Sequence, residues 1–359
     1  MIHIIIGTKA QLIKMAPIML RLQEKNIPYN FIFTGQHQET IDDLRENFSI
    51  KPPDVILHYG KDITSVSSML LWLIKISFKA LFFRNSIFQG NHKNNGIVLV
   101  HGDTFSTLLG AIMGRIAGLK VAHVESGLRS FDLWNPFPEE LTRIITSWLS
   151  NIYFCPGQWA VNNLKGFTGI KINTQHNTLF DSLDFALKVK QFSVAIPDKP
   201  YCVVTTHRFE NLCSYSILER NVSLIENIAQ KIRVVFILHP VTDRKLTQFN
   251  LKERLENNSS IELHPRYDYF NFIQLVNQSE FVVSDGGSNQ EESFYMGKPC
   301  LLLRKTTERT EGIEKNVVIS YYNENKVIEF VKNYSQYQIS PLKRPFSPTE
   351  IIINYIASQ

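Results

Sequence analysis

Short apolar runs that alternate with helix-length segments constrain the fold of this sequence more than any other feature. The run at residues 96–100 is uninterrupted, which is typical of a strand buried on both faces of a parallel sheet. Earlier in the chain, the run at 2–6 precedes a segment of helical character at 11–25. The run at 29–34 precedes another such segment at 39–48. This alternation predicts the α/β class with a doubly wound parallel sheet.

The second half of the chain alternates in the same way, with apolar runs at 201–206, 234–238 and 281–283. A chain of 359 residues is long enough for two such domains, each with its own hydrophobic core. We therefore predict one Rossmann-like domain at 1–166 and a second at 167–347, facing each other across a cleft.

Charge and cysteine usage exclude several classes of protein. The net charge is +5, but no block of Lys or Arg and no stripe of basic and aromatic residues indicates nucleic-acid binding. The four cysteines are scattered and form no C-x-x-C pair, so we expect free thiols in a reducing, cytoplasmic compartment and no metal site. The N-terminal apolar run is too short for a signal peptide and is interpreted as the first strand.

One segment, residues 69–83, is apolar on almost every side. Lys75 and Lys79 interrupt it, and it is shorter than a membrane-spanning helix, so no membrane insertion is expected. We interpret it as a helix that is buried within the fold and in part against a second subunit, which predicts a homodimer.

Three carboxylates stand at the ends of apolar segments in the first half of the chain. Asp103 and Glu125 each follow an apolar run, and Glu139 starts the next segment of helical character, in which Arg143 shares its face. Ligands bind beyond the carboxyl ends of the strands in open parallel sheets. A single acid at a strand end is usually a cap. Three acids at one edge favour proton abstraction and delivery instead.

Basic residues follow other predicted strands, where they suit an anionic ligand. Lys9 and Lys14 flank the turn after the first strand, where helix-start amides also attract anions, although an ordinary helix cap explains that turn equally well. His207 and Arg208 follow a strand of the second half and suit phosphate binding or acid–base chemistry, whereas a single histidine there is by default structural. His239 ends the next strand.

A glycine-rich turn, Gly286-Gly287-Ser288, separates a predicted strand from a predicted helix in the second half. Backbone amides exposed at such a helix start form a cradle for phosphate. Glu292, inside that helix, is placed to accept hydrogen bonds from the two hydroxyls of a ribose. The second half of the chain therefore predicts a nucleotide site.

These segments closely resemble the non-hydrolysing UDP-N-acetylglucosamine 2-epimerase family, and the resemblance covers nearly the whole chain in order. The family patterns HGDT, HVEAGLR and PEE-x-x-R are matched by HGDT at 101–104, HVESGLR at 123–129 and PEELTR at 138–143. The family patterns GHRRE, DSGG-x-QEE and R-x-TTERPE are matched by THRFE at 206–210, DGGSNQEE at 285–292 and RKTTERTE at 304–311.

The resemblance implies a glycosyltransferase-B-like fold, whose final helix, within 348–359, packs against the N-terminal domain. It also implies an isomerase that inverts C2 of a UDP-sugar by eliminating UDP to a glycal and adding UDP back after reprotonation on the other face. The implied catalytic residues are Asp103, Glu125, Glu139 and His207. The implied substrate-binding residues are Lys9, Lys14, Arg143, Arg208, His239, Phe272, Gly286, Gly287, Ser288, Glu292 and Arg309. No cofactor or metal is implied, and the product is expected to supply surface polysaccharide synthesis.

The chain departs from the family pattern at several positions. Lys9 replaces a family arginine, and Gly286 and Ser288 exchange the family's serine and second glycine. The loop at Gln36-His37 matches a family loop that is linked to a second, regulatory substrate molecule. Phe272 matches the residue beside uracil, although an aromatic residue in a helix core is an equally good explanation.

Three alternatives stay open on the sequence alone. They are a hydrolysing relative that releases UDP and free N-acetylmannosamine, a glycosyltransferase of the same fold, and a non-catalytic module that binds a sugar nucleotide. A binding module would not need all three acids, and a transferase would not need acids on both sides of C2. The acids therefore favour the epimerase.

Overall fold

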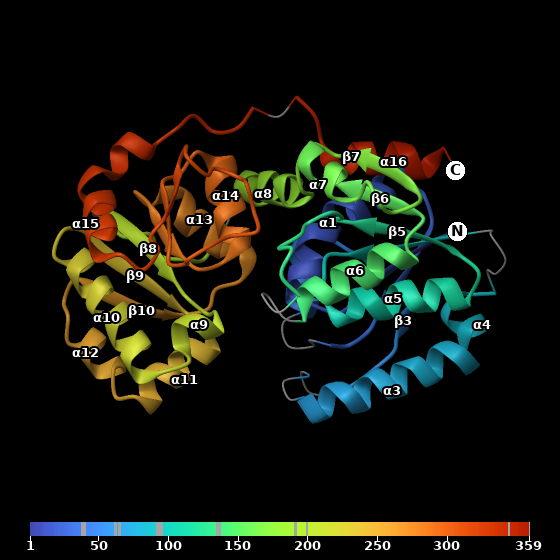
Figure 1. Ribbon diagram of the computed structural model, residues 1–359, viewed down its shortest axis with the longest axis horizontal. Helices are drawn as coiled ribbons and strands as arrows, with labels where there is room; N and C mark the ends of the chain where they lie inside the picture. Colours follow the sequence, from blue (N-terminus) through green and yellow to red (C-terminus); the bar gives the residue numbers. More distant parts are fainter. Residues whose placement is uncertain are drawn as a thin grey trace. The chain divides into compact units, whose positions relative to one another are not determined.

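The computed structural model describes residues 1–36, 41–60, 63, 66–90, 96–133, 138–189, 192–198, 200–343 and 345–358. The chain forms two compact units, Met1–Ser182 with Pro345–Gln359, and Leu183–Arg344 (Figure 1). Each unit contains a parallel β-sheet with helices packed on it, which confirms the predicted α/β class.

The sheet of the first unit has seven parallel strands in the order β3-β2-β1-β4-β5-β6-β7. They are β1 (Ile2–Ile6), β2 (Tyr29–Phe33), β3 (Val55–Ile56), β4 (Ile97–His101), β5 (Lys120–Val124), β6 (Ile152–Cys155) and β7 (Ile170–Asn173). The apolar run that predicted a doubly buried strand is β4, which is buried at every position and pairs with both β1 and β5. The strand order reverses between β1 and β4, and in this topology ligands bind beyond the carboxyl ends of the strands at that switch point.

The helices of the first unit connect these strands. They are α1 (Lys9–Glu24), α2 (Ile41–Asn47), α3 (Val66–Phe82), α4 (Arg84–Ile87), α5 (Phe105–Ile116), α6 (Glu139–Leu149), α7 (Gln158–Asn163) and α16 (Pro348–Ala357), while α8 (Leu179–Lys188) contains the division between the units. The last helix, α16, packs against α1, and Figure 1 marks both chain ends in this unit. Glu350 of α16 forms ion pairs with Arg21 and Lys25 of α1.

The division between the units comes later in the chain than the boundary predicted after residue 166. β7 pairs in parallel with β6, with Ile170 opposite Ile152, so the chain as far as Ser182 stays with the first sheet. The segment LKGFTG at 164–169, which indicated a change of domain, connects α7 to β7 instead. A turn between two elements of one sheet and a turn between two domains have the same composition, and only the strand pairing separates them.

Helix α5 lies close to the sheet because two of its residues have no side chain. A Cβ on Gly110 would sit 2.8 Å from Val100 Cγ1, and a Cβ on Gly114 would sit 3.0 Å from Val121 Cγ2. Gly118 has the same four-residue spacing, but it follows the end of α5 with a φ of +74°. Its role is to terminate the helix in the left-handed region rather than to pack on the sheet.

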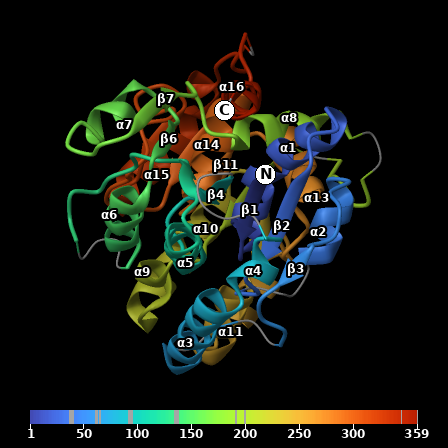
Figure 2. The ribbon, with the colours of Figure 1, turned by 90° about the vertical axis from the view of Figure 1, so that its right-hand side faces the viewer.

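Helix α3 contains most of the apolar segment at 69–83, and the expectation that this segment is buried holds for one face only. Trp72, Ile76 and Ala80 are buried in the core of the first unit, where α3 packs against α5. The other face is exposed to solvent in the single chain, and it consists of Leu70, Leu71, Ile74, Phe78, Leu81 and Phe82, followed by Phe83 just after the helix. Figure 2 shows the course of α3. No helix in the described part of the chain is long and apolar enough to cross a membrane.

The second unit repeats the plan with six parallel strands in the order β10-β9-β8-β11-β12-β13. They are β8 (Tyr201–Thr205), β9 (Arg233–Leu238), β10 (Ile261–Pro265), β11 (Val282–Ser284), β12 (Cys300–Leu302) and β13 (Val317–Ile319). Its helices are α9 (Phe209–Leu212), α10 (Tyr215–Ala229), α11 (Pro240–Gln248), α12 (Lys252–Glu256), α13 (Tyr269–Gln278), α14 (Gly287–Met296), α15 (Glu324–Asn333) and the 3-10 helix η1 (Tyr334–Tyr337). The short strands β3 and β13 were not predicted. The strand order reverses between β8 and β11, so this unit has a switch point of its own.

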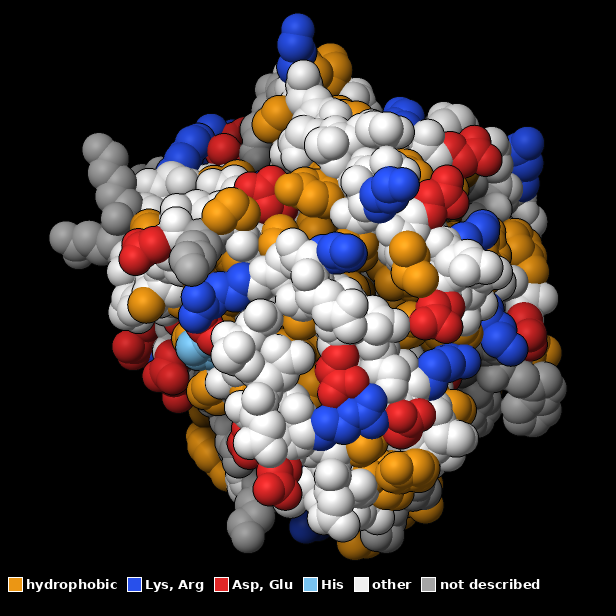
Figure 3. Space-filling model, turned by 90° about the vertical axis from the view of Figure 1, so that its left-hand side faces the viewer, with side chains coloured by type: hydrophobic (Ala, Val, Ile, Leu, Met, Phe, Trp, Pro, Cys, Tyr) orange, Lys and Arg blue, Asp and Glu red, His pale blue; other side chains and the backbone are white. Residues whose placement is uncertain are grey.

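Charged side chains of both signs are mixed on the face of the molecule shown in Figure 3. Some ion pairs of the second unit join two helices, as Arg254 of α12 does with Glu219 and Glu226 of α10. Such mixed surfaces are typical of solvated faces rather than of sites that follow a nucleic-acid backbone.

Candidate active site

The switch point of the first unit lies where β1 and β4 end. Thr8 is the N-cap of α1, and Gln11 closes a capping box with it. Gln11 Oε1 accepts a hydrogen bond from the main-chain N of Gly7 at 2.9 Å, and Gln11 Nε2 donates to the main-chain O of His101 at 2.8 Å. This buried glutamine therefore ties the start of α1 to the end of β4. The sequence interpretation assigned Gln11 no role, although its spacing of three from a threonine is the signal of a capping box.

Glu125 is the first residue after β5 and is buried. Its φ of 64° lies in the left-handed region, where a non-glycine residue costs about 1–3 kcal/mol and is found most often at functional sites. Lys14 Nζ donates to Glu125 Oε2 at 2.6 Å, and His101 Nε2 lies 3.1 Å from the same oxygen. Burial lowers the pKa of His101, although the hydrogen bond and the charge of Glu125 oppose that shift. Glu125 is thus a buried carboxylate held between a lysine and a histidine.

Asp103 is held by Arg143, which lies one turn into α6. Arg143 Nε and Nη2 donate to Asp103 Oδ2 at 2.9 and 2.6 Å. Thr142 Oγ1 donates to the main-chain O of Asp103, so α6 is fastened to the end of β4 at two points. Charge-assisted bonds of this kind are stronger than neutral ones and fix the direction of a carboxylate.

Glu140 is a fully buried carboxylate that the sequence interpretation did not assign. It accepts hydrogen bonds from Arg129 Nε at 2.5 Å, from the main-chain N of Ser130 at 3.0 Å and from Arg143 Nη1 at 3.3 Å. Burial would raise the pKa of Glu140, but the bonds from Ser130 and Arg129 outweigh it and lower that pKa. The doublet Glu139-Glu140 close to two arginines was the available signal, but spacing alone did not show which of the two acids binds the arginines.

The three predicted acids come together at one edge of the first unit. Asp103 and Glu125 follow β4 and β5, which are paired neighbours in the sheet. Glu139 is the first residue of α6, and Thr142 Oγ1 donates to the main-chain oxygens of both Asp103 and Glu139. The edge therefore combines carboxylates from three successive elements, which is the composition that proton transfer requires.

The switch point of the second unit is built around the buried Asp285. His207 Nδ1 lies 3.1 Å from Asp285 Oδ1, the main-chain N atoms of His207 and Arg208 donate to the same carboxylate, and Asn211 Nδ2 donates to it at 2.8 Å. Burial would raise the pKa of Asp285, but the hydrogen bond and the charge of His207 outweigh it and lower that pKa. A carboxylate on Nδ1 fixes the ring orientation and the tautomer of a histidine. Asp285 and Asn211 are therefore parts of the site that the sequence interpretation did not assign.

Other basic side chains surround His207. The rings of His207 and His239 have centroids 5.5 Å apart, and Arg266 Nη1 lies 3.4 Å from His239 Nε2. Arg208 Nη2 lies 3.6 Å from Glu308 Oε1. Burial would raise the pKa of Glu308, but the charges of three nearby arginines lower it to about 2. Arg266 is an addition to the predicted set, because it follows β10 outside the motifs that carried the resemblance.

The glycine-rich turn begins α14 and is tightly packed. A Cβ on Gly286 would sit 2.6 Å from Asn289 Oδ1, and a Cβ on Gly287 would sit 2.7 Å from Arg309 Nε. Arg309 Nη1 is 2.6 Å from Glu291 Oε1, an ion pair with both side chains buried. The other predicted residues of this turn lie in α14 and are Ser288 and Glu292. The first turn of α14 has main-chain N–H groups that no helical carbonyl can satisfy, and such groups attract phosphate.

The sequence matches a known family over most of its length. Residues 20–348 match the family described as UDP-N-acetylglucosamine 2-epimerase. Over 331 residues the chain is 34% identical to the UDP-N-acetylglucosamine 2-epimerase of Methanococcus maripaludis, an alignment that covers 88% of this chain and 86% of that protein. The chain belongs to the UDP-N-acetylglucosamine 2-epimerase family. It is therefore an enzyme of the isomerase class.

Solved structures of family members share the fold of this epimerase. The UDP-GlcNAc 2-epimerase of Methanocaldococcus jannaschii, in complex with UDP-GlcNAc and UDP, matches with a TM-score of 0.84 at 28% identity, over 100% of this chain and 99% of that one. The enzyme of Neisseria meningitidis bound to UDP-GlcNAc matches with a TM-score of 0.84 at 27% identity, over 100% of both chains.

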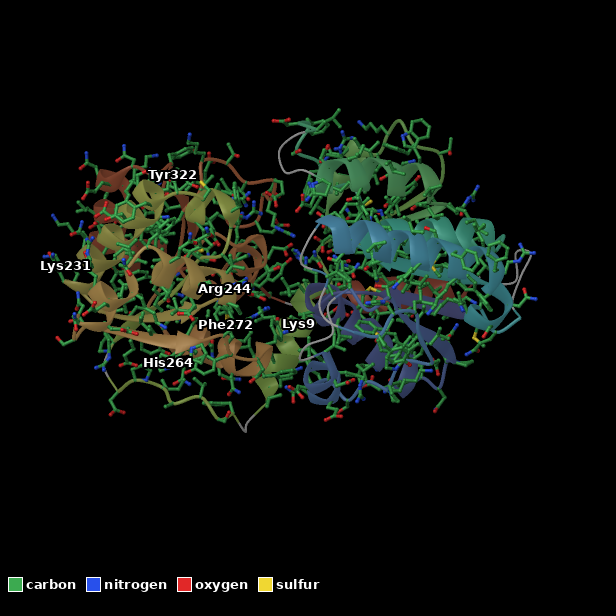
Figure 4. All side chains as sticks on the ribbon, turned by 90° about the horizontal axis from the view of Figure 1, so that it is seen from below. Lys9, Lys231, Arg244, His264, Phe272 and Tyr322 are labelled. Atoms are coloured by element: carbon green, nitrogen blue, oxygen red, sulfur yellow. The ribbon has the colours of Figure 1, made fainter. Side chains whose placement is uncertain are left out.

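Two more of the predicted substrate-binding residues lie in α1 and α13. Lys9 is the first residue of α1, and Phe272 is half-buried in α13 (Figure 4). Phe270 is the residue of that helix with core character, because it is buried with its ring centroid 6.0 Å from that of Phe185. The roles of Lys9 and Phe272 stay predictions. His37, on the predicted regulatory loop, lies outside the described residues.

Proposed function

We propose that this epimerase inverts C2 of UDP-N-acetylglucosamine to give UDP-N-acetylmannosamine, and that the sugar is still attached to UDP when turnover ends. The observation that carries the proposal is the acidic edge of the first unit, formed by Asp103, Glu125 and Glu139. The ligands named for the relatives from M. jannaschii and N. meningitidis support the class of substrate.

The chemistry explains why several acids are needed. The proton on C2 of the sugar is very weakly acidic. In the proposed route a carboxylate takes that proton, and the electron pair of the C2–H bond forms the C1–C2 double bond of a glycal. At the same time the C1–O bond breaks, and UDP leaves with the electron pair of that bond. An acid then delivers a proton to the opposite face of C2, and UDP adds back to C1. Two proton-transfer groups are required, one for each face of the sugar.

The contacts of each unit support a division of labour. Lys14 orients Glu125, and Arg143 orients Asp103, by the charge-assisted bonds described above. In the second unit, His207 is oriented by Asp285, and the start of α14 provides main-chain N–H groups. We propose that the second unit holds UDP and stabilises the negative charge that develops on the leaving diphosphate. Closure that excludes water would protect the glycal from side reactions.

Incubation with UDP-N-acetylglucosamine in heavy water tests the reaction. Deuterium at C2 of a sugar that is still joined to UDP is the expected result. Free UDP with free N-acetylmannosamine would show a hydrolysing enzyme instead, and unlabelled, unchanged substrate would refute the proposed substrate. Asp103→Asn should abolish label uptake while UDP still binds. The matched control is Asp42→Asn, since the Asp42 side chain is 76% exposed on α2.

We also propose that two copies of the chain associate through the exposed face of α3. Leu70, Ile74, Phe78 and Leu81 lie on that face at helical spacing, which is typical of a surface that another protein covers. Lys79 Nζ donates to the main-chain O of Leu57, so this cation is turned towards its own unit and does not rim the face for an anionic lipid surface. Sedimentation equilibrium should report a dimer for the native chain and a monomer for an Ile74→Asp, Phe78→Asp variant. A dimer that persists in the variant would refute the interface.

The four cysteines, Cys155, Cys202, Cys213 and Cys300, are free thiols, which supports the proposed reducing, cytoplasmic setting for this reaction.

A further inference from the structure

A chain of hydrogen bonds runs from the end of β11 into the first turns of α14. Ser284 Oγ accepts from the main-chain N of Gly286 at 3.0 Å and donates to Asn289 Oδ1 at 2.9 Å. Asn289 Nδ2 then donates to Glu292 Oε2 at 3.1 Å. Ser284 and Glu292 are buried, and Asn289 is half-buried. The side-chain amide of Asn289 therefore joins Glu292, the carboxylate of the predicted ribose site, to Ser284 at the end of β11.

The local sequence explains why this chain forms. Residues 289 and 292 are three apart in a helix, so their side chains share a face. An amide can accept one hydrogen bond and donate another at the same time, whereas a carboxylate cannot donate and an apolar side chain can do neither. Gly286 leaves room for the amide, because a Cβ there would sit 2.6 Å from Asn289 Oδ1 and 3.4 Å from Ser284 Oγ.

We propose that Asn289 is a positioning residue that orients the Glu292 carboxylate towards the two ribose hydroxyls of the nucleotide, and thereby sets the preference of the site for a ribonucleoside diphosphate. This inference rests on the proposed function, in which Glu292 accepts hydrogen bonds from the ribose. Two neighbouring hydroxyls can both donate to one carboxylate only in a restricted orientation. A side chain held in that orientation before binding loses less conformational freedom when the ligand arrives.

A purely structural role for Asn289 makes a different prediction. If its amide only stabilised the start of α14, its loss would weaken the binding of every nucleotide by the same factor, because the phosphate and base contacts would be disturbed together. A positioning role acts through the ribose hydroxyls. Its loss would therefore affect only ligands that carry them.

The experiment measures binding of UDP and of 2′,3′-dideoxy-UDP to the full chain by isothermal titration calorimetry. Native protein should bind UDP more tightly than the dideoxy ligand. Asn289→Leu should weaken UDP binding by about tenfold, the effect of one hydrogen bond to a charged group, and leave binding of the dideoxy ligand unchanged. Glu292→Gln should also weaken the binding of UDP and not that of the dideoxy ligand, with an effect at least as large. The control is Asn323→Leu, which removes the N-cap of α15 and should change neither affinity.

The two possible failures are distinguishable. If Glu292→Gln retains the native preference for UDP, the ribose role of Glu292 is wrong and the inference falls with it. If Glu292→Gln loses the preference but Asn289→Leu weakens both ligands equally, or neither, then Glu292 binds ribose and Asn289 does not position it. Should Asn289→Leu fail to fold, Asn289→Ala provides the second test, because it removes the same amide without adding a bulky apolar side chain and should reduce the preference for UDP in the same selective way.

Discussion

The two sheets of this epimerase share the order of six strands, to which the first sheet adds β7, but they carry side chains of opposite charge at their switch points. The edge of the first unit presents the carboxylates Asp103, Glu125 and Glu139. The edge of the second unit presents histidines, arginines and a glycine-rich helix start around His207 and Gly286. The same fold therefore carries acidic side chains at one edge and basic side chains at the other, because the residues at the strand ends, rather than the fold, decide the chemistry.

The acids at the two edges also have different partners. In the first unit, lysine and arginine side chains hold Glu125 and Asp103. In the second unit, Asp285 holds His207 and the start of the α9 turn. The contrast leads to an experimental distinction: changes at the first edge should affect proton transfer, and changes at the second should affect nucleotide affinity or the stability of that unit.

The largest effect is expected at Glu125. Glu125→Gln removes a carboxylate that can exchange a proton, so kcat and deuterium uptake at C2 should fall by about 10²–10⁴-fold while the affinity for UDP changes little. Steady-state kinetics and calorimetry measure the two quantities. Glu24→Gln, on the outer part of α1, is the matched control. A variant that loses UDP affinity as strongly as it loses turnover would break the distinction between the edges.

The next effect is expected at Gly286. In Gly286→Ala the new Cβ would meet Asn289 Oδ1 at 2.6 Å and His207 Cε1 at 3.2 Å, so the turn must shift and UDP affinity should fall by about tenfold. Gly166→Ala is the control, because a Cβ there would meet nothing within 4 Å. Unchanged UDP affinity in the Gly286 variant would show that this edge does not bind the nucleotide.

A smaller effect concerns the acid stability of the second unit. The folded pKa of Glu308 is about 2, below its ordinary value of 4.5, so its ionised form contributes stability that is fully present above about pH 4.5 and is lost as the pH falls towards about 2. Glu308→Gln should lower the free energy of unfolding by about 1–3 kcal/mol at pH 7 and flatten its decline in acid. Urea unfolding followed across that range measures both effects, with the exposed Glu314→Gln as control. If the free energy of unfolding of the Glu308 variant declined as steeply in acid as that of the native chain, the stabilising role of ionised Glu308 would be contradicted.

The smallest effect is expected where α16 meets α1. Glu350→Gln removes partly exposed ion pairs with Arg21 and Lys25, so the free energy of unfolding should fall by about 0.5 kcal/mol. Affinity for UDP should stay at the native value, because these pairs lie at the C-terminal end of α1, whereas the switch point of the first unit lies at its N-terminal end. A clear loss of UDP affinity in this variant, measured by calorimetry, would show that the C-terminal helix contributes to the second edge.

Sequence patterns were informative where the signal is local. The uninterrupted run at 96–100 predicted the buried strand β4, and acids after successive strands predicted one shared edge. Patterns were less informative where the partner is distant in sequence. The Lys14–Glu125 bond joins residues 111 apart, and the His207–Asp285 pair joins residues 78 apart. No spacing rule links such residues, because their contact depends on how the strands are ordered.

The same limit explains why the predicted domain boundary was misplaced and why the predicted burial of α3 holds for one face only. Composition at 164–169 indicated a break, but pairing of β7 with β6 keeps that part of the chain in the first unit. The apolar character of α3 indicated burial, but only the side with Trp72 and Ile76 is buried, where α3 packs against α5. Periodicity reports which residues avoid water, and it does not report what covers them.

The amino-acid sequence by itself determined the α/β class, the strand ends that carry acids or basic residues, and the motifs that identify the family, because each depends on neighbours within a few residues. The tertiary structure alone decided the bond between Lys14 and Glu125, the buried role of Glu140, and the pairing of His207 with Asp285. These features arise when separate elements are brought within hydrogen-bonding distance. That distance is set by packing of the whole unit rather than by any short stretch of the chain.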